Sequence, residues 1–107
     1  MIQKEINVNI DYLIKNGLVN YSDGDIVIMN SNEHPRLENT VKLEMVTIVY
    51  IEEGMMQADL NGKTVKAGKD DLVVCPPNTF VNRSLTSADF SSKVIGLSYK
   101  AMQRSLL

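Results

Sequence analysis

Hydrophobic and polar residues alternate with a period of two along most of the chain, which favours short β-strands over helices. The clearest case is a hairpin, in which residues 55–60 and 63–67 flank Asn61-Gly62. This dipeptide best supplies the two positive φ angles of a type I′ turn. A two-residue loop then aligns apolar with apolar and polar with polar residues. The predicted pairs are Ala58 with Val65, Met56 with Ala67, Asp59 with Thr64 and Gln57 with Lys66.

Other runs of β-branched and apolar residues between turn residues predict further strands. These strands are residues 6–10, 25–29, 42–51, 72–75, 80–86 and 93–99. The run 42–51 alternates at first and then becomes apolar on both faces, which is typical of a central strand. The run 72–75 is predicted to be a short buried strand that ends at Pro76-Pro77, because proline cannot donate to a ladder. Short strands with turns at regular intervals indicate a mostly β fold, a small barrel or a sandwich.

Short helices are predicted near both ends of this pattern. The first is a helical turn with Asp11 as its N-cap and Gly17 as its stop. From Lys100 the period of two is lost, and good helix formers place Met102 and Leu106 on one face. No residue caps this second helix, so we expect the chain to stop inside it.

Composition narrows the class of protein. A chain of 107 residues corresponds to one domain. It carries 11 basic and 13 acidic residues, with a net charge of −2 and no basic cluster, so we expect no binding to nucleic acid by this segment. The single cysteine fits a reducing compartment and predicts a cytoplasmic location. No signal-peptide pattern and no apolar run of about 18 residues is present, so no membrane association is expected.

The order of these features from Lys42 to Tyr99 resembles a known family. A strand, a Glu-Gly corner, the Asn-Gly hairpin and then AGKDDLVVCPPN are similar to the cupin-like N-terminal regulatory domain of AraC-type transcription regulators. The resemblance implies a cupin-like β-barrel, or double-stranded β-helix, over residues 1–99 and the start of a linker or dimerisation helix at 100–107. A DNA-binding domain would follow beyond Leu107. A non-catalytic homodimer that senses a sugar or another small metabolite is the implied function.

The resemblance also permits a check against the metal-binding cupins. Their histidine and glutamate ligands would correspond to Thr40 or Val41, Lys42 or Leu43, Thr47 and Val81. None of these residues replaces an imidazole ligand. Asp70 stands where the second metal motif usually has a glycine. We therefore expect no metal, no cofactor and no metal-dependent enzyme activity.

Four residues are candidates for the functions that the resemblance implies. Tyr50 and Arg83 would contact a ligand if they face into the barrel, the tyrosine as an aromatic wall and the arginine as a fork for a carboxylate or vicinal hydroxyls. Both could instead face outward. Met102 and Leu106 would belong to the dimerisation helix.

The remaining reactive or adaptable side chains have simpler interpretations. His34 is interpreted as a solvated loop residue and not as a pocket base, and Cys75 as a core thiol and not as a redox sensor. Glu52 and Glu53 cannot flank one substrate because adjacent strand residues point to opposite faces. The methionines are interpreted as core in preference to an adaptable binding surface: Met45, Met55, Met56 and Met102.

Two other functions remain open. The chain could be a stand-alone small cupin, either a metal-free enzyme or a sugar-binding barrel. It could also be a structural interaction barrel whose helix from Lys100 docks a partner. A reading frame that continues for about 100 residues with two helix-turn-helix patterns would support the regulator, and one that ends at Leu107 would exclude it.

Overall fold

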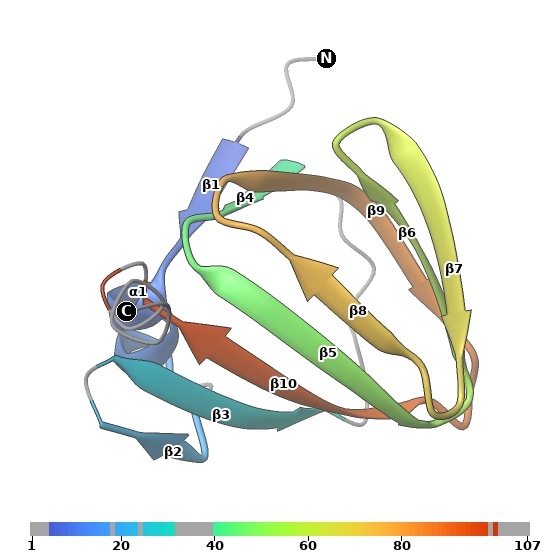
Figure 1. Cartoon of the computed structure of the whole chain (residues 1–107), viewed down its shortest axis with the longest axis horizontal. Helices are drawn as coiled ribbons and strands as arrows, with labels where there is room; N and C mark the ends of the chain where they lie inside the picture. Colours follow the sequence, from blue (N-terminus) through green and yellow to red (C-terminus); the bar gives the residue numbers. More distant parts are fainter. Residues whose placement is uncertain (1–4, 18, 24, 32–39, 99, 101–107) are drawn as a thin grey trace.

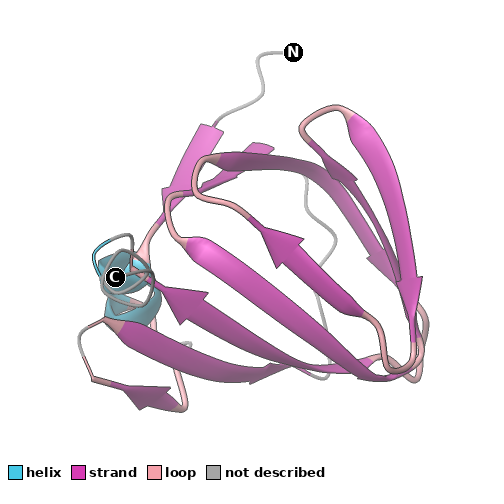
Figure 2. Ribbon diagram, in the orientation of Figure 1, coloured by secondary structure: helices cyan, strands magenta, loops and turns pink. Residues whose placement is uncertain are grey.

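Two β-sheets face each other in this protein (Figures 1 and 2). The computed structural model describes residues 5–17, 19–23, 25–31, 40–98 and 100, and only the backbone of Glu5, Ser31 and Arg83. The predicted mostly β fold is confirmed. The predicted C-terminal helix at 100–107 falls almost entirely outside the described residues. No helix within the described part is long and apolar enough to span a bilayer.

The first sheet has the strand order β1-β4-β9-β6-β7. Its strands are β1 (Glu5–Val8), β4 (Thr40–Leu43), β9 (Thr79–Thr86), β6 (Met55–Leu60) and β7 (Lys63–Gly68). Strands β1 and β4 run parallel, and the other neighbours are antiparallel.

The second sheet has the order β2-β3-β10-β5-β8, and all of its neighbours are antiparallel. Its strands are β2 (Tyr21–Ser22), β3 (Ile26–Ser31), β10 (Ser91–Leu97), β5 (Val46–Glu53) and β8 (Leu72–Cys75). No ladder joins the edge strands of the two sheets among the described residues, so the expected closed barrel is corrected to an open, sandwich-like arrangement.

Two apolar clusters fill the space between the sheets. The first consists of Val8, Ile10, Leu13, Val27, Val41, Met45 and Val81. The second consists of Val49, Ile51, Ala67, Val73, Cys75, Phe90 and Val94. Each cluster takes side chains from both sheets, so burial of apolar area holds the sheets together.

The predicted hairpin is confirmed in every pair. Strands β6 and β7 align Ala58 with Val65 and Met56 with Ala67, and the polar pairs lie on the other face as expected. Asn61 and Gly62 have φ angles of 50° and 80°, as a type I′ turn requires.

The predicted single strand 42–51 is wrong. The chain forms β4 and β5, which belong to different sheets, and it changes sheet at Glu44 and Met45. Glu44 N donates to Val8 O at 2.8 Å, and Met45 is only 2% exposed. The odd-numbered residues from Leu43 to Ile51 stay inward through this corner, although Val46 is buried as well, and no glycine or proline marks it. The pattern therefore gave no sign of the break.

The N-terminal helix α1 (Ile10–Lys15) begins earlier than predicted. Asn9, not Asp11, is the N-cap, and its Oδ1 accepts from Tyr12 N at 2.8 Å. The predicted strand 6–10 consequently ends at Val8, since Ile10 is already helical. The predicted stop at Gly17 is confirmed by its φ of 67°. The short strand β2 was not predicted.

Strand β8 has the predicted bounds but not the predicted burial. Val73 and Cys75 are buried, whereas Leu72 and Val74 are 63% and 59% exposed. This alternation arises because one face of the second sheet lies on the core and the other faces outward.

Cys75 is expected to resist thiol reagents in the native protein. Its side chain is buried, and burial raises the pKa of the thiol because it disfavours the thiolate. Labelling with an aromatic disulfide should be at least about 100-fold slower in buffer than in denaturant, because it requires opening of the core. The pKa of the Cys75 thiol is higher in the folded chain than in the unfolded chain. Its contribution to the free energy of unfolding is therefore fully present below the unfolded pKa and is lost as the pH rises through the folded pKa. Rapid stoichiometric labelling of the native chain at neutral pH would contradict this burial.

Candidate functional site

The positions that correspond to metal-cupin ligands can now be located. Val41 and Val81 lie opposite each other on β4 and β9, and both are buried in the first apolar cluster. Leu43 packs against the same cluster, and Thr47 is buried with its Oγ1 donating to Met45 O at 3.4 Å. Packed aliphatic side chains therefore occupy this part of the interior. Within the described residues, no three or more His, Cys, Asp or Glu side chains form a group able to hold a metal ion.

The alternative positions Thr40 and Lys42 face outward. Thr40 Oγ1 donates to Asn82 Oδ1 at 2.7 Å, and Lys42 Nζ lies 5.8 Å from the centre of the Phe80 ring. Both residues thus belong to the outer surface of the first sheet.

Asp70 occupies a turn that favours glycine. Its φ is 70°, the left-handed region in which the glycine of the resembled motif would be unstrained. Asp70 Oδ1 accepts from the Tyr50 hydroxyl at 2.9 Å, and Asp70 N donates to Ile51 O at 2.8 Å. Asp71 Oδ2 also accepts from Gly68 N at 2.7 Å. These bonds hold the turn in place without the glycine.

Tyr50 lies on the outer face of β5 and not between the sheets. It is 38% exposed, and the adjacent Asp70 carboxylate raises the pKa of its hydroxyl, since the carboxylate accepts its proton in a hydrogen bond. In this position Tyr50 cannot form the inner wall of a ligand pocket.

The other predicted site residues are only partly visible. Arg83 lies on β9, in the opposite sheet from Tyr50, and its side chain is outside the described residues. His34, Met102 and Leu106 also lie outside the described residues. Their predicted roles stay predictions.

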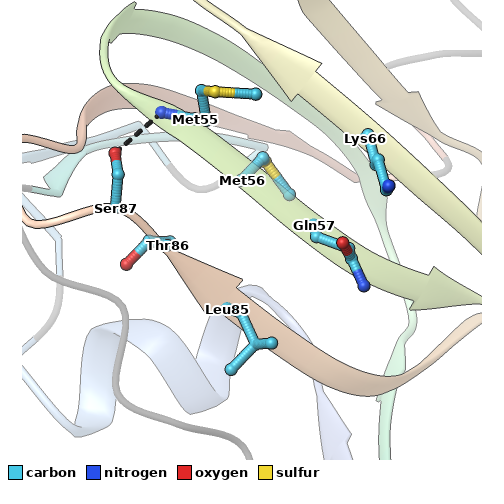
Figure 3. A pocket seen from close by; sticks show the side chains of 7 residues that line it. All are labelled: Met55, Met56, Gln57, Lys66, Leu85, Thr86 and Ser87. Carbon is cyan, nitrogen blue, oxygen red and sulfur yellow. Dashed lines mark hydrogen bonds between the residues drawn. The ribbon is translucent and has the colours of Figure 1, made fainter.

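A shallow groove of about 260 Å³ lies on the outer side of β6, between its neighbours β7 and β9 (Figure 3). Its lining residues are Met55, Met56, Gln57, Lys66, Leu85, Thr86 and Ser87. The register brings three of them into one row across the sheet, with Gln57 opposite both Lys66 and Leu85. One end is fixed by Ser87 Oγ, which accepts from Met55 N at 2.9 Å and donates to Asp89 Oδ1 at 2.7 Å.

The groove combines apolar and polar contacts. Met55 is 60% exposed and Leu85 is 50% exposed, so they offer thioether and aliphatic surface. Gln57 can both donate and accept hydrogen bonds, and Lys66 supplies an ammonium group. This combination suits a small molecule with one apolar face and a few hydrogen-bonding groups.

Met55 and Met56 were interpreted as core, and this interpretation is wrong for Met55. Met56 packs partly against the second cluster, and Met45 is buried as expected. The hairpin register placed Gln57 beside Lys66 correctly. The sequence offered no signal that β9 would add Leu85, because that contact joins strands far apart in the chain.

One interior polar atom also stands out. Ser92 Oγ is buried, with the residue 1% exposed, and it has no hydrogen-bond partner within the described part of the chain. An unsatisfied buried hydroxyl costs about 1–3 kcal/mol, so Ser92 lowers the stability of the core around it.

Comparison with known proteins supports the fold and revises the function. No protein-family model matches the chain, and no curated protein matches it either. Among solved structures, Pac13 from Streptomyces, a nucleoside dehydratase, has a TM-score of 0.62 at 19% identity, over 73% of this chain and 63% of that chain. A Pac13 variant with uridine matches equally well. A protein of unknown function from Rhizobium leguminosarum has a TM-score of 0.56 at 20% identity, over 71% of this chain and 76% of that chain.

These neighbours are cupin-like barrel proteins, so the cupin part of the predicted fold is supported. The aligned region spans less than two thirds of the Pac13 chain. The AraC-type regulatory domain and the absence of enzyme activity are both corrected, because the solved structures that share this fold include an enzyme, Pac13. The physical reason for the error is that regulators and enzymes share the order of strands and turns on which the prediction depended.

Proposed function

We propose that this chain is a stand-alone small cupin that binds a nucleoside-like or sugar-like molecule and catalyses a reaction on it. The observation that carries the proposal is the structural likeness to Pac13, a nucleoside dehydratase also solved with uridine. Identity of 19% means that the likeness supports the fold directly and the chemistry only by analogy.

The groove beside β6 is the proposed binding site. Its volume of about 260 Å³ is below the range of about 300–1,000 Å³ for drug-sized ligands, which favours a compact molecule such as a nucleoside or a monosaccharide. Met55 and Leu85 would cover an apolar ring face, while Gln57 and Lys66 would bond to carbonyl or hydroxyl groups.

The proposed chemistry is proton transfer. Lys66 is the titratable side chain among the groove residues, and an ammonium group can give a proton to a leaving hydroxyl or hold a developing oxyanion. Thr86 and Ser87 would add hydroxyl groups at one end of the groove.

Uridine binding tests this proposal. Titration of uridine, and of a panel of nucleosides and monosaccharides, should raise the melting temperature of the wild-type protein with at least one compound. The variants Lys66→Ala and Gln57→Ala should weaken that binding by about tenfold each, as loss of one hydrogen bond to a ligand does. Lys63→Ala is the matched control, since Lys63 is also exposed on β7 but projects from the other face.

Turnover is measured by mass spectrometry after incubation with the compound that binds. A product that Lys66→Ala no longer forms would support catalysis at the groove. Binding without any product would show that the chain binds a sugar or a nucleoside but does not catalyse a reaction on it. A flat melting profile across the whole panel would contradict the proposed function.

A further inference from the structure

The outer face of the second sheet carries a continuous row of apolar side chains. The register aligns one residue from each strand, in the order of the sheet: Tyr21, Ile28, Ile95, Ile48 and Val74. Tyr21 and Val74, at the two ends of the row, are 55% and 59% exposed. Leu72 and Tyr50 form a pair next to this row, at 63% and 38% exposed.

The outer face of the first sheet is mixed in composition. Its polar positions, Asn7, Lys42, Gln57, Asp59, Thr64 and Lys66, are interspersed with the exposed Met55, Leu85 and Phe80. A sheet with one face on a core normally has polar residues on the other face. The second sheet departs from that rule along this row, which crosses all five strands, and a large exposed apolar patch usually marks an interaction surface.

We infer that the outer face of the second sheet is a homodimer interface, covered by the same face of a second copy. The five strands hold two to eight residues each, and at about 3.4 Å per residue and about 4.8 Å between strands the face covers about 440 Å² per copy. Two such faces bury about 900 Å², the size of a weak, reversible interface.

The row is complementary to itself. A two-fold axis along the central strand β10 places Ile95 opposite Ile95 of the second copy and Ile28 opposite Ile48 of the second copy. The same axis places the large side chain of Tyr21 opposite the small side chain of Val74. An interface of this kind, in which one patch meets itself, is the usual geometry of a symmetric dimer.

The charges on this face lie beside the centre of the row. Lys93 is two residues from Ile95 on β10, so the proposed axis brings it opposite Lys93 of the second copy. The Glu52 carboxylate, whose Oε2 is 4.0 Å from Lys93 Nζ, offsets the repulsion between these two ammonium groups, and the pair as a whole is neutral. This favours a second copy over a charged partner.

Sedimentation equilibrium of the wild-type chain should show a dimer. Val74→Lys should raise the dimer dissociation constant by at least about tenfold, since it places a charge in the apolar contact. Ile95→Lys, at the centre of the row, should raise the dissociation constant further. Because Ile95 is half-buried, this variant could unfold, and Val74→Lys is then the test of the interface. Phe80→Lys, on the outer face of the first sheet, should leave the dimer intact.

A charge-swap experiment tests the register of the two copies. Tyr21→Glu and Val74→Lys should each weaken self-association, but a mixture of the two variants should form a heterodimer, because the proposed axis brings the two introduced charges together. A monomeric wild type, an unaffected Val74→Lys dimer or equal loss with Phe80→Lys would overturn the interface. Failure of the mixture to associate would overturn the proposed axis.

Discussion

Replacing Phe90 by alanine is expected to lower the free energy of unfolding by about 3–5 kcal/mol, as truncation of a buried phenylalanine does. Phe90 is 2% exposed and belongs to the second apolar cluster, where it packs between the two sheets. A domain of this size has a total stability of about 5–15 kcal/mol, so this loss would be a large part of it. Urea unfolding followed by circular dichroism measures the change.

Phe80 is a matched control for this substitution, because it is the other phenylalanine of the chain. It is 37% exposed on the outer face of β9, beneath the Lys42 ammonium group. Phe80→Ala should cost no more than about 1 kcal/mol, which includes a cation–π contact of about 0.5–1 kcal/mol. Equal losses from the two variants would show that Phe90 does not hold the sheets together.

Gly54→Ala is expected to destabilise the protein by about 2–5 kcal/mol, the sum of backbone strain and overpacking. Gly54 has a φ of 81°, which a residue with a Cβ atom adopts only at a cost. An added Cβ would also lie 2.5 Å from Ser87 Oγ and 2.8 Å from the Phe90 Cα. The first neighbour is a side chain and could rotate, but the second is backbone, so the turn before β10 would have to move.

Gly62→Ala separates the two contributions. Its φ of 80° is nearly the same, yet within the described part of the chain no atom other than those of Gly62 and its two chain neighbours lies within 4 Å of the added Cβ. It should therefore lose only about 1–2 kcal/mol, from backbone strain alone. The difference between the two midpoints in urea measures the crowding at Gly54, and identical midpoints would contradict the close contact with Phe90.

The local parts of the fold were predictable from the sequence. The Asn61-Gly62 turn determines a register that involves only neighbouring strands, so the residue pairs of β6 and β7 could be derived one by one. The bounds of β8 followed in the same way from the acidic corner before it and the prolines after it.

The non-local parts could not be predicted. The change of sheet at Glu44 and Met45 left the alternation intact, so 42–51 looked like one strand. Whether the outer residues of β8 are covered depends on its place at the sheet edge, which periodicity does not encode. The predicted N-cap, Asp11, lies two residues after the observed N-cap, Asn9. Helix ends assigned by different criteria differ by one or two residues.

The candidate site was predictable only in part. The hairpin register brought Gln57 and Lys66 together, but the contact with Leu85 needs the pairing of β6 with β9. Tyr50 was a candidate because of its residue type, and its orientation toward Asp70 depends on a turn 20 residues away in the chain. Function was hardest to predict, because the order of strands that suggested a regulator also occurs in enzymes.

The corner between β4 and β5 also limits how the length of this chain can change. Val46, at the start of β5, is also buried, but the residues that point between the sheets on both sides of the corner share one parity: Val41, Leu43, Met45, Thr47, Val49 and Ile51. Insertion of one residue at the corner would turn the inner face of β5 toward the outside, while insertion of a pair would preserve it. Related sequences should therefore gain or lose residues here in even numbers, which is a constraint on insertions that no single side chain reveals.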